Sequence, residues 1–185
     1  MDGAFYNDLR EPFIASDLTA ISPLATAVAM YTPSNFPVLG GQYFSRPGKA
    51  IKIAMFFRMT SAATPGNVSW TVLYGTGASA NGVTLASSLA KAWLANQTSG
   101  SCYLEVVITC RTVGSAGTLF CTGFVLPHVA HVVSTLQPVL IPDTAPAVSA
   151  ACDLTAALIV SVQMIRSGST AETAQIHQMQ VTALN

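Results

Sequence analysis

The chain has 185 residues, a formal net charge of zero, 51% hydrophobic residues and only 9% charged residues. This length fits one domain with a sizeable core, and the composition excludes intrinsic disorder, which needs few apolar residues and a high net charge. The Lys and Arg residues are scattered and form no basic stripe, so we expect no nucleic-acid partner.

Membrane association and secretion are also disfavoured by the sequence. No stretch reaches the roughly 18 uninterrupted apolar residues that a spanning helix needs. The opening residues, MDGAFYNDLREP, carry acids where a signal peptide is basic, so we expect a chain that is made and used without secretion. Because net charge keeps small domains apart in solution, so few charges predict that much of the surface lies against other protein.

In chain order, the first segment, residues 1–20, has no alternation and combines acidic residues with Phe5 and Tyr6. We interpret it as an arm separate from the domain that follows at 21–185. Terminal segments of this kind stay unordered unless they dock on something.

The rest of the chain alternates apolar and polar residues with a period of two, which predicts half-buried strands. In 51–59 the odd positions are apolar, and in 102–110 the even ones are. The complete set of expected strands is 25–31, 38–44, 51–59, 67–74, 81–89, 102–113, 117–126, 154–166 and 176–184. We therefore expect an all-β, antiparallel sandwich or barrel of about eight strands.

Turn chemistry separates these strands. The TPGN sequence at 64–67 suits a type II turn, and GSAG at 114–117 closes the clearest hairpin. The Pro-rich stretch 137–146 cannot be a central strand, because proline lacks a ladder donor. We expect it to cross the outside of the sandwich as an extended connection between the two sheets.

The candidates for chemistry each have a plainer interpretation. His128 and His131 have helical metal-ligand spacing, but no third ligand is near and Pro127 opens the segment, so we interpret them as a surface pair. His177 shares parity with apolar residues, which favours the core or a subunit interface. Trp70 alternates with apolar residues and is expected in the core rather than on a sugar platform.

The thiols and acids suggest no active site either. Cys102 and Cys110 fall on an apolar parity as small core residues, and Cys121 lies in a strand without electropositive neighbours. The acids outside the N-terminal half, Glu105, Asp143, Asp153 and Glu172, are not brought together by any pattern. We therefore expect no enzyme, no cofactor and no metal site.

A succession of turns and strands gives a family resemblance. It comprises PSNFP (33–37), RPGKAIKI (46–53), SAATPGNVSW (61–70), LEV (104–106), RTVGSAGT (111–118) and the paired strands 157–165 and 176–184. This pattern resembles one that recurs in tailed-bacteriophage virion proteins, over about residues 21–185. Members of that group are similar to small trimeric jelly-roll domains that decorate the capsid or form head fibres and tail appendages.

The resemblance implies a jelly-roll β-sandwich and a structural role on the exterior of a virion. It implies a capsid decoration protein that binds the assembled head as a homotrimer, contacts the major capsid protein and stabilises the shell. The alternative is a head-fibre or tail adhesin whose loops, 75–81 and 95–101, meet a host glycan or receptor. Such a protein would be made in the host cytoplasm.

Two sets of residues follow from this role. The arm is expected to dock on the capsid lattice through Phe5, Tyr6, Phe13 and Ile14. Apolar residues on outward-facing parity are expected to form the subunit interface: Phe56, Tyr103, Val107, Ile159 and Ile165.

Overall fold

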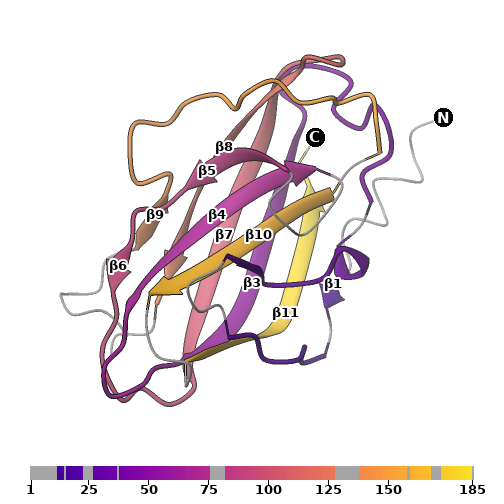
Figure 1. Ribbon diagram of the computed structural model, residues 1–185. Coiled ribbons are helices and arrows are strands. Elements are labelled where there is room, and N and C mark those ends of the chain that lie inside the picture. The colour runs from indigo at the N-terminus through magenta and orange to yellow at the C-terminus, as the bar shows by residue number, and fades with distance from the viewer. Residues whose placement is uncertain are drawn as a thin grey trace.

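The computed structural model is an all-β sandwich of two antiparallel sheets (Figure 1). It describes residues 12–14, 16–22, 27–36, 38–75, 82–127, 138–157, 159–167 and 172–184. Within these ranges the one helical element is a single 3-10 turn, η1 (Pro33–Asn35). The predicted fold class is confirmed.

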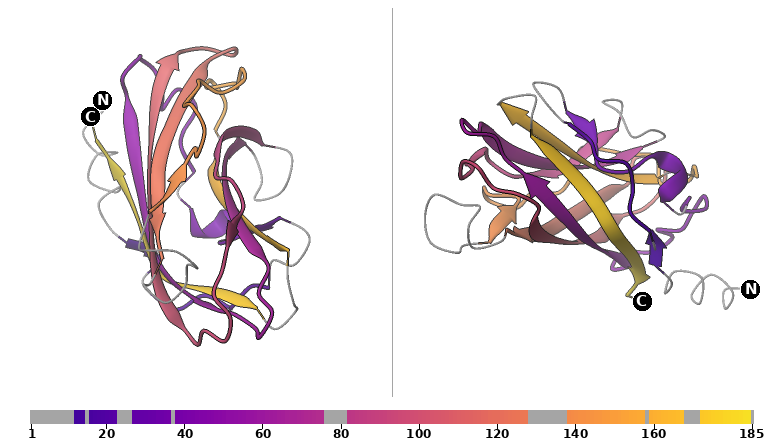
Figure 2. Two further views of the ribbon diagram at one scale, coloured as in Figure 1. Left: turned by 90° about the vertical axis from the view of Figure 1, so that its left-hand side faces the viewer. Right: turned by 90° about the horizontal axis from the view of Figure 1, so that it is seen from below.

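The strands divide unequally between the two layers, which face each other in Figure 2. The six-stranded sheet has the order β1 (Pro12–Ile14), β11 (Thr173–Ala183), β3 (Ala50–Thr60), β7 (Gly100–Thr112), β8 (Thr118–Leu126) and β9 (Val139–Ile141). The second sheet has the order β2 (Val28–Ala29), β10 (Ile159–Ser167), β4 (Asn67–Gly75) and β5 (Val83–Ser87), with β6 (Lys91–Ala92) also paired to β4.

The connectivity is that of a jelly roll. If β1 to β5, β7, β10 and β11 are counted as the first to eighth strands, the two sheets read 1-8-3-6 and 2-7-4-5. This is the order in which two Greek keys wrap around one core. The β8 and β9 strands widen the first sheet beyond β7.

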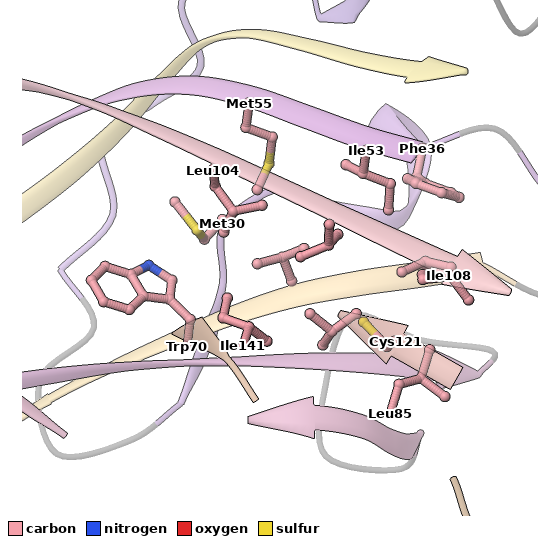
Figure 3. Close-up of a cluster of buried hydrophobic side chains, with 14 of the residues drawn as sticks. Met30, Phe36, Ile53, Met55, Trp70, Leu85, Leu104, Ile108, Cys121 and Ile141 are labelled. Carbon is pink, nitrogen blue, oxygen red and sulfur yellow. The ribbon is translucent and has the colours of Figure 1, made fainter. Parts of the chain in front are cut away.

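The core lies between the layers and follows the predicted alternation (Figure 3). The inward side chains of β3 are at most 1% exposed: Ile51, Ile53, Met55, Phe57 and Met59. Those of β7 are at most 3% exposed: Cys102, Leu104, Val106, Ile108 and Cys110. Both predicted inward rows are confirmed, as is the hairpin at 114–117, where Gly114 has a φ of 94°.

The strand expected at 38–44 does not form, and the segment contains a turn at 41–44. Gln42 takes a left-handed φ of 66°, and the amide of Tyr43 donates to the carbonyl of Gly40. A side chain on Gly41 would collide with the backbone of Thr155, so this turn is packed tightly against the chain near 155. Apolar residues here, such as Phe44 at 1% exposure, enter the core from a turn.

Three residues of the Pro-rich stretch form an edge strand. Residues Val139–Ile141 form β9 beside β8, flanked by Pro138 and Pro142. The prediction that this stretch is no central strand is confirmed. The prediction that it only connects the sheets is wrong for these three residues, because edge strands tolerate neighbouring prolines.

The N-terminal segment is part of the sandwich from residue 12 onward. Residues Pro12–Ile14 pair with β11, and the amides of Leu18 and Ile21 donate to carbonyls of the same strand. Ile14 is 3% exposed within the core, so its predicted role as a capsid anchor is wrong. The Ile14 side chain is already buried by folding, so it has no exposed apolar surface left for a partner. Phe13 lies in β1, and Phe5 and Tyr6 lie outside the described residues.

The close approach of β7 and β8 depends on Gly123, which is paired with Val106. A β-carbon there would collide with the Glu105 carbonyl and with Val106. We expect Gly123→Ala to lower the free energy of unfolding by about 1–3 kcal/mol, because the strands must separate. Urea denaturation measures this, with Thr122→Ala as a control on the same strand. Equal midpoints for both variants would contradict the tight approach.

Candidate interaction face

The acidic residues, histidines and cysteines of the described part of the chain form no cluster of metal ligands. No three His, Cys, Asp or Glu side chains gather there in a way that would hold a metal ion. Three of the acids instead contact cations: Lys52–Glu105 at 3.7 Å, Lys91–Asp143, and Arg166–Glu172 at 2.9 Å. Paired carboxylates for hydrolysis are therefore not formed by these residues.

The histidines fall in different places. His177 lies 2.6 Å from Asp17 with a third of its side chain exposed, so it is not a core histidine. His128 and His131 lie outside the described residues.

The four cysteines are all free and buried. The predicted core positions of Cys102 and Cys110 are confirmed. Burial raises the pKa of the Cys121 thiol to about 12, which leaves almost no thiolate near neutral pH. This environment is the opposite of one that activates a cysteine nucleophile.

We expect the native protein to resist thiol-modifying reagents. An ordinary cysteine has a pKa of about 8.5 and reacts faster as the pH rises from about 7 to 9. Cys121 should stay unlabelled over this range and react only after unfolding, as followed by mass spectrometry. Rapid labelling of Cys121 in the folded protein would contradict its burial.

The tryptophans belong to the core, as predicted for Trp70. Trp70 is 0% exposed and Trp93 is 3% exposed, and their rings lie 5.9 Å apart. Neither ring can offer a platform for a sugar.

The outer side of the six-stranded sheet carries a group of apolar side chains, which we call the aromatic face. It comprises Phe56 on β3, Tyr103 and Val107 on β7, Phe120, Phe124 and Leu126 on β8, and Leu140 on β9. Three of these side chains are largely open to solvent: Phe56 at 53%, Leu140 at 51% and Leu126 at 42%. An exposed cluster of this kind on one sheet is typical of an interaction site.

Strand register assembles the aromatic face. Phe56 lies opposite Tyr103, with ring centroids 4.7 Å apart. Tyr103 lies opposite Leu126 and 6.3 Å from the Phe124 ring, and Phe124 lies opposite Leu140. Cross-strand aromatic pairs of this type stabilise a sheet while leaving their outer surfaces available.

Polar groups lie along and around the apolar residues. The Tyr103 hydroxyl donates to Glu105 at 2.6 Å. Burial and this neighbouring carboxylate raise the pKa of Tyr103 to about 12, so the hydroxyl keeps its proton. Arg58 donates to Gln175, and Arg111 stacks on Phe120 at 4.5 Å. An apolar centre with a polar rim is the anatomy of a protein interface.

The structure divides the five residues predicted as a subunit interface. Phe56, Tyr103 and Val107 lie together on the aromatic face. Ile159 is 5% exposed in the core, so its prediction as an outward residue is wrong. Ile165 lies on β10 in the other sheet and is not part of the face.

The outward residues of β8 and β9 were not among the residues predicted for the interface. Phe120, Phe124 and Leu126 lie on the parity opposite to the buried Leu119, Cys121 and Val125. The alternation within the expected strand 117–126 would have been enough to predict that these three residues face outward. Leu140 could not be assigned, because its strand exists only beside β8.

The edges of the larger sheet are poorly suited to association. At one edge β1 begins with Pro12, and at the other β9 is three residues long between two prolines. Short edge strands with prolines block the addition of further strands. The outer side of the sheet is therefore the more accessible surface for a partner.

The fold and this surface define a class: a jelly-roll β-sandwich with an apolar outer face on its larger sheet. No protein-family model and no curated protein matches the chain. Its likeness to solved structures is distant. A legume lectin-like domain from Entamoeba histolytica has 6% identity and a TM-score of 0.29, over 74% of this chain and 73% of that one. The metal-free lectin I-B4 from Griffonia simplicifolia has 9% identity and a TM-score of 0.34, over 100% and 97%.

Among the described residues, no helix is long and apolar enough to cross a bilayer.

Proposed function

We propose that the chain is a structural subunit on the exterior of a bacteriophage virion. In this role it is a capsid decoration protein that self-associates as a homotrimer and stabilises the assembled head by binding the major capsid protein. The observation that carries the proposal is the aromatic face, with Phe56, Leu126 and Leu140 open to solvent on one sheet. The family resemblance of residues 21–185 adds the virion as the setting.

The charge balance supports self-association through this face. A chain with zero net charge has little electrostatic repulsion between copies in solution. Exposed aromatic side chains on such a molecule promote aggregation unless a defined partner covers them. A closed ring of identical subunits covers one such surface on every copy and leaves none at the ends.

Stabilisation of the shell would follow from mass action. A protein that binds only the assembled shell lowers the free energy of that state in proportion to RT ln(1 + [L]/Kd). No catalytic residue is needed for this effect.

Two measurements test the proposal. Light scattering of the purified chain should give the mass of a trimer, and a monodisperse monomer at micromolar concentration would overturn the self-association. A map of an intact particle should show the chain in many copies on the head. A few copies confined to the tail would replace decoration with the adhesin function.

A further inference from the structure

A hollow opens at one end of the sandwich, beside the hairpin turn at 114–117. It has a volume of about 190 Å³, and its apolar lining comes from Phe44, Val113 and Leu154. Val113 is 44% exposed, so solvent reaches this lining. An apolar cavity of about 150 Å³ is large enough to bind benzene. The hollow can therefore admit one aromatic ring from a partner.

A negative charge lies beside the hollow. The Asp153 carboxylate accepts hydrogen bonds from the Thr155 hydroxyl at 2.6 Å and the Thr155 amide at 2.9 Å, and Thr155 lines the hollow. These hydrogen bonds hold the pKa of Asp153 below its usual range, so the group is ionised at neutral pH. Among the described residues, no cation forms an ion pair with Asp153. The hollow should therefore favour a partner that combines an aromatic ring with a cation.

The aromatic face presents that combination on β3. Phe56 is 53% exposed, and Arg58 follows it on the same outward side of the strand. Two residues of a strand span about 7 Å. Arg58 donates to the neutral side chain of Gln175 and forms no ion pair with a described acid. Its charge is therefore available to an acid of a partner.

The hollow and this part of the aromatic face lie too far apart to meet within one copy. Arg58 is paired with Ser101, near the start of β7, whereas the hollow lies just beyond Thr112, at the end of β7. Ser101 and Thr112 are eleven residues apart, about 36 Å along an extended strand. A contact between the two surfaces must therefore join two copies of the chain.

We infer that Phe56 of one copy enters the hollow of a neighbouring copy, where Arg58 meets Asp153. This inference rests on the proposed self-association and names both sides of the contact. The contact is heterologous, because the side of one sandwich meets the end of the next. Heterologous contacts close into a ring when the rotation between copies allows it, as a homotrimer requires.

Exchange of the two charges tests the inference. Arg58→Asp and Asp153→Arg, each alone, bring like charges together and should raise the concentration at which the oligomer dissociates by about tenfold or more. The double variant restores opposite charges on exchanged sides, so its dissociation should return close to that of the unaltered chain. Light scattering across a dilution series measures association, and urea denaturation checks that each variant is folded. A folded double variant without recovery would overturn the inference.

A variant of the hollow gives a second readout, which does not depend on the turn that Asp153 stabilises. Val113→Trp fills the hollow and should prevent association by excluding Phe56. Leu89→Trp is the matched control, because Leu89 is 54% exposed and does not line the hollow, and it should leave association unchanged. A trimer that persists in Val113→Trp would overturn the inference while self-association stands. A monomeric unaltered chain would overturn self-association itself.

Discussion

Replacing Glu172 with Gln is expected to lower the free energy of unfolding by about 3–5 kcal/mol, because it leaves the Arg166 charge buried without a partner. The Arg166 Nη2 and Glu172 Oε1 atoms lie 2.9 Å apart, and both side chains are 1% exposed. Arg166 otherwise donates through Nη1 to the carbonyl of Thr60 at 3.4 Å. Burial lowers the pKa of Arg166, and Glu172 opposes that effect. Urea denaturation at neutral pH measures the loss.

Two comparisons make this result specific to the buried pair. The double variant Arg166→Met with Glu172→Leu removes both charges, and it should recover most of the lost stability. Lys52→Gln breaks a partly exposed pair with Glu105, and it should cost less than about 1 kcal/mol. If Glu172→Gln costs no more than Lys52→Gln, the pair is hydrated in solution and the burial argument is wrong.

Alternation in the sequence predicted those strands that have one buried side and one exposed side. In β3 and β7 one side is buried and the other is at least partly open, so alternation located them to within two residues. Alternation predicted the bounds of β10 less well, because Ser161 and Gln163 are buried like their apolar neighbours. The three-residue strands β1 and β9 had no signal of their own, since each exists only through its longer neighbour.

The residues of the aromatic face were predictable to the extent that one strand defines them. Phe56 and Tyr103 were found from outward parity, but their contact is set by the register between β3 and β7. Ile159 shows the limit of this reasoning. Parity predicts which side of a strand a residue occupies, but not whether other parts of the chain bury that side. The Arg166–Glu172 ion pair was not predicted, because charged residues near a turn are usually exposed to solvent.

A substitution on the aromatic face should weaken self-association much more than it weakens folding. Phe56 is 53% exposed in the single chain but contacts the Tyr103 ring, so Phe56→Asp should lower the free energy of unfolding by only about 1 kcal/mol or less. In the proposed oligomer the same carboxylate would be desolvated at the centre of the interface. Loss of an aromatic anchor there costs at least about 2 kcal/mol, which weakens association by about 30-fold or more. Light scattering across a dilution series should therefore show dissociation at much higher concentration than for the unaltered chain.

Leu89→Asp is the matched control, because Leu89 is 54% exposed but lies outside the aromatic face. It introduces the same charge on an equally open apolar residue, so general gains in repulsion or solubility affect both variants alike. Dissociation by Phe56→Asp alone assigns the contact to the aromatic face. Equal dissociation by both variants would show that net charge controls association, and dissociation by Leu89→Asp alone would move the contact to another surface.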